Sequence, residues 1–317
     1  MQIKKKNKHS HNLFNKKLKS LEDLHKQHSH IQYSINSESI ETIVTDWTGI
    51  PLNRITANTS DKIKQLKQHL KQNVIGQNHA TEMIMHSMSQ QLLKINDPDK
   101  PLGVFLFTGP SGVGKTHTAK IIAELFFGSA EHMTTLNMSE FKESHKVSML
   151  LGSPPGYVGY GEGGVLTEPV RRQPYHLILL DEIEKAHDSI HEVFYQIFDQ
   201  GLAKDSQGRE INFKNTIFIM TCNIGSELCS SIENCKADTI KNPLQSLLLN
   251  HFKPAFLGRI KTIPFTAITA ASAEMIISRK LDIIIKRIID NHDIGIDFDT
   301  KTVESILSNS DYELTGA

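Results

Sequence analysis

The sequence is poor in the features that stabilise secreted proteins and anchor membrane proteins. Its 317 residues include three cysteines, an odd number without the CxxC spacing of a metal site. This excludes a disulfide scaffold and is typical of a reducing cytosol. No run approaches the roughly 18 continuous apolar residues of a membrane-spanning helix, and the basic start leads into His and Asn, unlike a secretory signal. We expect a cytoplasmic protein without a membrane partner.

An excess of either charge is also absent. Lys and Arg together number 35, as do Asp and Glu, so the chain gives no electrostatic reason to expect a nucleic-acid partner. The balance conceals a basic segment, because residues 1–30 hold eight lysines and five histidines but two acids. Two interpretations remain open: a tail that binds metal or polyanions, or a solvated, partly disordered leader, which the composition favours. The helical spacing of Phe14, Leu18 and Leu21 predicts a short amphipathic helix inside it.

From Ser39 onward the composition is that of a folded α/β protein. Helical patterns of about a dozen residues alternate with short apolar runs that predict strands. The predicted strands are 104–107, 134–138, 176–180, 216–221 and 261–265. This alternation predicts a five-stranded parallel sheet covered by helices on both faces.

Beyond the fifth strand the pattern becomes mostly helical. It predicts a helix at 273–289, a short strand at 296–298 and a helix at 301–308. We therefore expect four regions: a basic leader (1–40), a connector with an entry helix (41–72), a large α/β domain (73–264) and a small helical domain (265–317).

A complete phosphate-binding pattern follows the first predicted strand. Every position of GxxxxGK[ST] is matched by Gly109-Pro110-Ser111-Gly112-Val113-Gly114-Lys115-Thr116. Glycines let the backbone curl so that its N–H groups point at phosphate oxygens, and the helix that follows offers its positive N-terminus. Lys115 would reach the β- and γ-phosphates of ATP, and Thr116 would ligate Mg²⁺. A glycine-rich turn that binds nothing is the alternative, and the flanking strand and helix count against it.

Acidic and polar side chains follow two further predicted strands. Asp181 and Glu182 come directly after the apolar run 177–180, and Asn223 comes soon after the run 216–221. Asp181 suits a Mg²⁺-linked role, and Glu182 can polarise a water for in-line attack on the γ-phosphate. Asn223 would lie at the carboxyl edge of the sheet, beside the γ-phosphate, although alone it would indicate only a turn. Together with the phosphate loop, these residues predict hydrolysis of ATP rather than binding alone.

One long stretch resembles the second ATPase module of the Clp/HSP100 AAA+ unfoldases: GSPPGYVGYGEGGVLTEPVRRQPYHLILLDEIEKAH. Around it, in the family's order, lie WTGIP, VIGQ, TCNIGS and FKPAFLGRI, so the resemblance covers roughly residues 35 to 317. Within the family the chain is most similar to the ClpV branch, which serves type VI secretion. It reads GYGEGG and FLGR where ClpB-type disaggregases more typically read GYEEGG and FLNR.

The resemblance implies an AAA+ P-loop fold, homo-hexameric rings and a protein substrate threaded through the ring pore. Tyr157, followed by Val158, matches the pore-loop aromatic that grips the substrate; a plain glycine-rich loop is the alternative. Arg259 matches the arginine finger that completes a neighbouring subunit's site. Ile75 and Gly76 resemble the backbone pocket for adenine, or else they simply join two helices.

The chain also departs from the family. Pro169 stands where Ala is usual, and a proline beyond the first helical turn causes a kink, so we give Arg171 and Arg172 no role. In the family an arginine follows the final Gly-Ala pair, so we expect a truncated lid and missing N-terminal modules. Residues 226–250 contain no Gly, which counts against the Ile/Leu-Gly-Phe/Leu loop of a ClpP-type protease partner.

The sequence therefore predicts an ATP-dependent unfolding motor that recycles contracted type VI secretion sheaths. Two alternatives stay open. One is a ClpB-like disaggregase module, and the other is a truncated remnant that binds nucleotide without productive turnover.

Overall fold

The computed structural model describes residues 40, 43, 59–93, 95, 97–153, 156, 161, 163–230, 237–292 and 295–310. The chain divides into two compact units, Met1–Thr48 and Gly49–Ala317, and every element named below belongs to the second. The amphipathic helix predicted in the basic leader lies outside the described residues. Among the described residues, no helix combines the length and the apolar character needed to cross a membrane.

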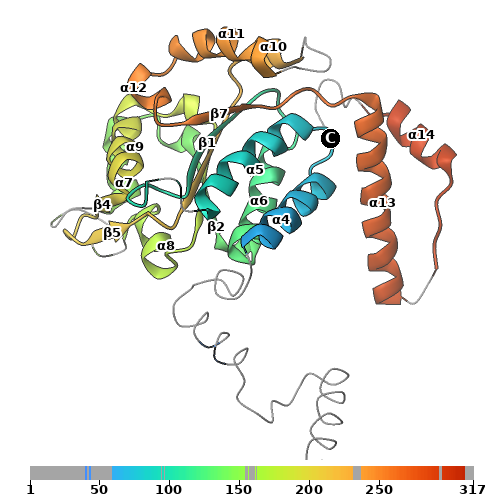
Figure 1. Cartoon of the computed structure of the whole chain (residues 1–317), viewed down its shortest axis with the longest axis horizontal. Coiled ribbons are helices and arrows are strands. Elements are labelled where there is room, and N and C mark those ends of the chain that lie inside the picture. Colours follow the sequence, from blue (N-terminus) through green and yellow to red (C-terminus); the bar gives the residue numbers. More distant parts are fainter. Residues whose placement is uncertain are drawn as a thin grey trace, which may run out of the picture. The chain divides into compact units, whose positions relative to one another are not determined.

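A five-stranded parallel sheet forms the centre of the second unit, which confirms the predicted α/β fold (Figure 1). Its strands are β1 (Gly103–Thr108), β2 (Met133–Asn137), β3 (Leu177–Asp181), β6 (Ile217–Cys222) and β7 (Lys261–Pro264). They lie in the order β2-β3-β6-β1-β7, and all four pairings are parallel. The strands β3, β6 and β1 are therefore neighbours, and their carboxyl ends meet at one edge of the sheet.

Helices cover both faces of this sheet. One face carries α4 (Thr59–Asn73), α5 (Asn78–Leu92) and α6 (Lys115–Phe127). The other carries α7 (Val147–Leu151), α8 (Thr167–Arg172), α9 (Asp188–Gln200), α11 (Ala237–Leu249) and α12 (Pro254–Leu257). Side chains alternate along each strand, so Phe105 and Leu106 of β1 belong to opposite cores. Burial on both faces explains why the three inner strands, β3, β6 and β1, are largely apolar runs.

Two helices, α13 (Ala270–His292) and α14 (Thr300–Ser308), follow β7 and contact each other. The helices predicted in this region are confirmed, but the strand predicted at 296–298 is wrong. A strand needs a partner for its backbone groups, and the sheets of the described residues do not include this segment. It serves instead as the connection to α14, whose first turn is capped by Asp299, which accepts the N–H of Thr302 at 2.9 Å.

The structure adds an antiparallel hairpin that the sequence did not predict. It consists of β4 (Leu202–Lys204) and β5 (Glu210–Asn212). The buried carboxylate of Asp205 organises the turn by accepting the N–H groups of Gln207 and Arg209, each at 2.9 Å. Strands of three residues are too short to produce a recognisable alternation in the sequence.

Pro169 does not disturb its helix. Because α8 begins at Thr167, Pro169 lies in the first turn, where a backbone N–H has no acceptor within the helix. The expected kink is therefore wrong. The side chains of Arg171 and Arg172 both bind Glu168, at 2.7 and 2.9 Å.

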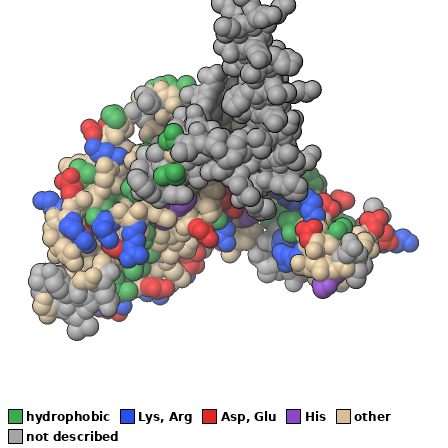
Figure 2. Space-filling view, turned by 90° about the horizontal axis from the view of Figure 1, so that it is seen from below, with side chains coloured by type: hydrophobic (Ala, Val, Ile, Leu, Met, Phe, Trp, Pro, Cys, Tyr) green, Lys and Arg blue, Asp and Glu red, His purple; other side chains and the backbone are tan. Residues whose placement is uncertain are grey.

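Acidic and basic side chains are interspersed on the face of the molecule seen in Figure 2, in keeping with their equal numbers in the sequence.

His176 is a buried titratable group at the entrance to β3. Its side chain is 3% exposed, and its Nε2 lies 2.8 Å from the hydroxyl of Thr134. Burial, together with a smaller effect of the nearby His132, lowers the pKa of His176 to about 4. A histidine in an unfolded chain has a pKa of about 6.5. Because the unfolded chain therefore binds the proton more tightly than the folded one, protonation of His176 favours unfolding. The stability that this neutral imidazole contributes is complete above about pH 6.5 and is lost as the pH falls toward 4.

Replacing His176 with glutamine should make the protein less sensitive to acid. Between pH 7 and pH 5 we expect the free energy of unfolding of the wild type to fall by about 2 kcal/mol more than that of His176→Gln. Urea unfolding at the two pH values measures this difference. His69→Gln, at an exposed position on α4, is the control and should behave as the wild type. Equal pH dependence in wild type and His176→Gln would contradict the argument.

Candidate functional site

The phosphate loop, residues 109–116, connects β1 to α6. Gly109, Gly112 and Gly114 have φ angles of 142°, 74° and 97°, which lie in the region that favours glycine. At Gly109 a Cβ atom would lie 2.2 Å from the carbonyl oxygen of Phe265, so only glycine fits. Gly114 immediately precedes α6, and the loop therefore ends at a helix N-terminus, whose free N–H groups and dipole favour an anion.

The ammonium group of Lys115 is held inside this loop. It donates to the carbonyl oxygens of Gly109 and Pro110 at 2.5 and 2.9 Å, and to Oδ1 of Asn223 at 2.9 Å. Burial lowers the pKa of Lys115, and the nearby Glu184 and Asp181 carboxylates offset part of that effect. The hydrogen bond between Lys115 and Asn223 joins two residues that are 108 positions apart in sequence.

A cavity of about 250 Å³ opens beside the loop. Its lining includes Lys115, Thr116, Asp181, Glu182 and Asn223, with Ser111, Gly112 and Gly114 of the loop itself. These residues come from the ends of β1, β3 and β6, which are neighbouring strands. Most of the side chains for which the sequence predicts phosphate chemistry therefore surround one space, which we call the phosphate cavity.

Glu182 stands on an unusual backbone. Its φ is 57°, and it is the only non-glycine residue with positive φ among the described residues. Its Oε2 accepts a hydrogen bond from Nζ of Lys185 at 2.7 Å, and this bond raises the pKa of Lys185. Glu182 thus lines the phosphate cavity while a neighbouring ammonium group holds its carboxylate.

Asn223 is oriented by a residue that the sequence analysis did not single out. Its backbone N–H donates to Oε1 of Glu184 at 3.0 Å, and its side-chain Oδ1 accepts from Lys115. Glu184 lies in the 3₁₀ turn Ile183–Lys185 that follows Glu182. The turn after β3 and the loop after β6 are therefore tied together at the edge of the phosphate cavity.

Ile75 and Gly76 lie between α4 and α5, followed by the buried Gln77. Gly76 has a φ of 79°, and a Cβ there would lie 2.8 Å from the hydroxyl of Ser272 in α13. The Gln77 side chain donates to the carbonyl oxygens of Val113 and Thr266, at 3.4 and 2.8 Å, and accepts the N–H of Thr266 at 3.0 Å. The segment predicted to bind adenine thus adjoins both the phosphate loop and the first turn of α13.

Arg259 is not among the residues that line the phosphate cavity. It follows α12 and forms a two-pronged ion pair with Asp199 of α9, at 2.8 Å from Nε and 2.6 Å from Nη2. Its guanidinium also lies over the ring of Tyr195, 5.3 Å from the centroid. The hydrogen bond to Asp199 raises the pKa of Arg259. Tyr157 and Val158 lie outside the described residues.

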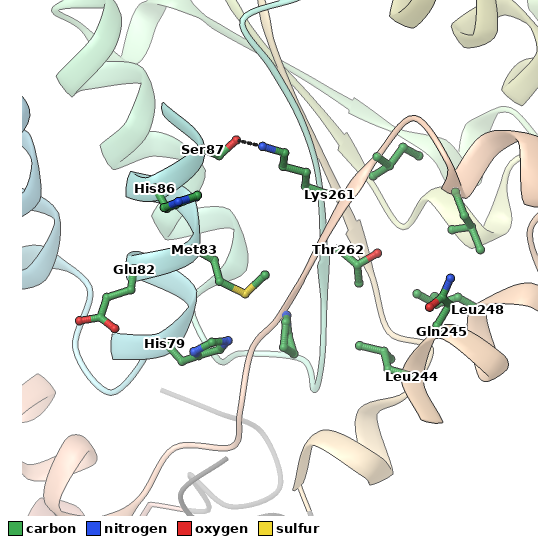
Figure 3. Close-up of a pocket in the computed structure, with 13 residues that line it drawn as sticks. His79, Glu82, Met83, His86, Ser87, Leu244, Gln245, Leu248, Lys261 and Thr262 are labelled. Carbon is green, nitrogen blue, oxygen red and sulfur yellow. Dashed lines mark hydrogen bonds between the residues drawn. The ribbon is translucent and has the colours of Figure 1, made fainter. Parts of the chain in front are cut away.

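A second, larger cavity of about 620 Å³ lies elsewhere. Met83 and His79 of α5 and Leu244 and Leu248 of α11 face it from opposite sides, with β7 between them (Figure 3). Its lining contains none of the phosphate-loop residues and only one carboxylate, Glu82, which pairs with Lys71 at 3.0 Å. This cavity therefore lacks the combination of a phosphate loop and two carboxylates that the smaller one has.

The residues around the phosphate cavity fit a magnesium nucleotide. Thr116 and Asp181 offer the hydroxyl and carboxylate oxygens that Mg²⁺ prefers. The described residues hold no group of three or more His, Cys, Asp and Glu side chains suited to a metal. A cation here would therefore depend on phosphate oxygens as well, as is usual for Mg²⁺.

Comparison with known proteins identifies the family to which this fold and site belong. Residues 100–263, just over half of the chain, match the family described as AAA domain (Cdc48 subfamily). The matched segment contains the phosphate loop, both acids, Asn223 and Arg259. The chain belongs to the AAA family of ATPases.

Its relatives within this family include Clp proteins, two of which have nearly the same sequence identity to the chain. The chain is 44% identical over 282 residues to the AAA+ ATPase ClpV1 of Pseudomonas aeruginosa, covering 87% of this chain and 31% of ClpV1. It is 45% identical over 292 residues to the chaperone protein ClpB of Yersinia enterocolitica, covering 90% and 33%. The ClpB of Bdellovibrio bacteriovorus is 37% identical over 313 residues, covering 95% and 36%. The chain, a Clp-type AAA+ ATPase module, thus spans about a third of the length of these relatives.

The sequence analysis of this AAA module missed several residues of the site. They are Thr221, Glu184, Lys185 and Asp199, which bind Asp181, Asn223, Glu182 and Arg259 respectively. Lys185 had a local signal, because it lies three positions after Glu182, the spacing of neighbours on a helical turn. The other three act on partners 39 to 60 residues away, and no local pattern reveals such contacts.

Proposed function

We propose that this chain is the ATP-hydrolysing module of a Clp-type unfoldase that threads protein substrates through the pore of a homo-hexameric ring in the cytoplasm. The observation that carries the proposal is the phosphate cavity, because a phosphate loop, a hydroxyl, two carboxylates and an amide converge there. Binding alone would require only the loop and Lys115. The additional acids at the end of β3 favour hydrolysis.

In the proposed mechanism the chain binds the triphosphate of ATP with the loop amides, the N-terminus of α6 and the Lys115 ammonium group. Lys115 already lies against Asn223, so both can contact the terminal phosphate. Thr116 and Asp181 would hold Mg²⁺, which neutralises developing charge on the phosphate oxygens when bound. Glu182 orients and polarises the attacking water, and a hydrogen bond to Lys185 holds its carboxylate ready.

Three further roles belong to this proposal. Ile75 and Gly76 contact the adenine. Arg259 acts on the phosphate cavity of a neighbouring subunit, a role supported by its position outside this chain's own cavity. Tyr157 and Val158 form the pore loop that grips an extended substrate.

For the substrate we propose the contracted sheath of type VI secretion, with no ClpP-type protease as partner. The identity to ClpV1 and the FLGR and GYGEGG motifs support this choice. The identity to ClpB, which is equally high, supports a disaggregase module as the second candidate. Disassembly of purified contracted sheaths and reactivation of an aggregated reporter enzyme distinguish the two, with each substrate tested on the same preparation.

Mixing two inactive variants tests the hydrolysis and the ring together. Lys115→Ala and Arg259→Ala should each lose most ATP turnover alone, because one loses its phosphate cavity and the other its finger. Mixed in equal amounts, they should regain turnover, since Lys115→Ala chains supply Arg259 to the intact cavities of their neighbours. Phosphate release at increasing protein concentration measures the gain.

The control mixture combines Lys115→Ala with Glu182→Gln. Both changes lie in the same cavity, so this mixture should regain nothing. If the first mixture is no more active than the control, Arg259 does not act between subunits. If the wild-type chain hydrolyses no ATP at any concentration, the proposed function itself is contradicted.

A further inference from the structure

Thr221 is a buried hydroxyl at the carboxyl end of β6. Its side chain is 2% exposed, and its Oγ1 makes two hydrogen bonds to the turn after β3. It donates to Oδ1 of Asp181 at 2.5 Å and accepts the backbone N–H of Glu182 at 3.0 Å. A hydroxyl can do both at once because it carries one donor and two acceptor positions. One side chain thus contacts both acids of the site.

The sheet register explains why this residue reaches both acids. β3 and β6 pair in parallel up to Leu180 and Met220, so Asp181 and Thr221 are the next positions along the two strands. β3 ends there, and Glu182 enters the left-handed region with a φ of 57°. A non-glycine residue in that region needs support from its surroundings. The bond from the Glu182 N–H to Thr221 is such support.

The bond to Asp181 has a different consequence. Asp181 lines the phosphate cavity, and with its Oδ1 held by the Thr221 hydroxyl the carboxylate cannot rotate freely there. Partners of this kind orient metal ligands, and their loss typically weakens metal binding about 10- to 100-fold.

We infer that Thr221 is a positioning residue for both acids, orienting Asp181 toward Mg²⁺ and holding the backbone from which Glu182 reaches the water. This inference rests on the proposed ATP hydrolysis. Thr221 itself lies in the lining of the phosphate cavity, but its hydroxyl is engaged by Asp181 and by the Glu182 N–H, so we assign its role to these two hydrogen bonds.

The test compares Thr221→Val, which keeps the side-chain shape without the hydroxyl, with Thr221→Ser, which keeps the hydroxyl. A fluorescent ATP analogue is titrated against each full chain in EDTA and at increasing MgCl₂. For Thr221→Val, the MgCl₂ concentration that gives half-maximal tightening should rise about tenfold or more. Affinity in EDTA should stay within about twofold, because loop and Lys115 are unchanged. Where turnover is measurable, kcat should fall more than KM changes.

Thr216→Val is the matched control. Thr216 is fully buried and directly precedes Ile217, the first residue of β6. Its hydroxyl donates to the carbonyl oxygen of Phe213 at 2.7 Å. Both Thr216→Val and Thr221→Val should lower the melting temperature, because each removes a buried hydrogen bond. Thr216→Val should nevertheless leave the MgCl₂ dependence at the wild-type value. Thr221→Ser should match the wild type within about threefold, because its hydroxyl can make the same two bonds.

Each outcome decides the question. If Thr221→Val has the MgCl₂ dependence and turnover of the wild type, the positioning role is wrong while the proposed function stands. If Thr216→Val shifts the MgCl₂ dependence equally, the effect is general destabilisation and the inference fails. If the wild type binds no nucleotide, the proposed function fails and this inference with it. Should Thr221→Val not fold, Thr221→Cys, whose thiol is a weaker donor and acceptor, takes its place in the same comparison.

Discussion

Lys115→Ala is expected to weaken nucleotide binding by roughly a hundredfold, the equivalent of one lost hydrogen-bonded charge. The Lys115 ammonium group contacts two loop carbonyls and Asn223, so alanine removes a positive charge and three hydrogen bonds together. Isothermal titration of the chain with ATP or ADP measures the loss. In the proposed mechanism the lysine binds phosphate before any chemistry, so the binding constant itself should change.

Lys120→Ala provides the control for this prediction. Lys120 lies on the same helix, α6, but its side chain is exposed, so its loss should leave nucleotide affinity unchanged. If both variants bound nucleotide as the wild type does, the phosphate loop would not be the binding site.

Glu182→Gln should separate binding from hydrolysis. The amide keeps the size and one oxygen of the carboxylate but cannot take up a proton, so ATP turnover should fall about a hundredfold or more. Nucleotide affinity should stay close to that of the wild type, because the role proposed for Glu182 begins only when the water is activated. Single-turnover phosphate release alongside equilibrium binding measures both quantities.

A matched change at an exposed acid controls for loss of charge. Glu124→Gln lies on α6 away from the phosphate cavity and should hydrolyse ATP at the wild-type rate. Hydrolysis by Glu182→Gln at that same rate would assign the water-activating role to another residue.

The sheet could be predicted because most of its strands produce a clear hydrophobic pattern in the sequence. Each of the three inner strands, β3, β6 and β1, is largely an apolar run, since helices cover both faces, and a helix follows most of them. The phosphate loop and the acids could be predicted for the same reason: they directly follow such runs, and the carboxyl ends of parallel strands share one edge. The β4–β5 hairpin was not predictable, because its strands have three residues each.

The contacts that complete the site were beyond sequence reasoning. Thr221 appeared only as the end of an apolar run, yet its hydroxyl binds Asp181 at the end of the neighbouring strand and the backbone N–H of Glu182 in the turn that follows. Arg259 and Asp199 are 60 residues apart and meet only because α9 and α12 lie on the same face of the sheet. Pro169 was misjudged for a local reason, since its effect depends on where α8 begins. Helix ends are the least certain part of any sequence-based prediction.

The Gln77 amide has a consequence for motion. Through hydrogen bonds it links the α4–α5 connection, the phosphate loop at Val113 and the strand exit at Thr266. Thr266 lies four residues before α13, and Gly76 lies so close to that helix's first turn that a Cβ atom would come within 2.8 Å of the Ser272 hydroxyl. A displacement of the loop when phosphate binds would therefore act directly on the pivot of α13. Because α13 is 23 residues long, about 35 Å at 1.5 Å per residue, a small rotation at its first turn would displace its far end much more than its start. The Gln77 side chain would thus transmit a movement of the phosphate loop to α13 through its hydrogen bonds to Val113 and Thr266.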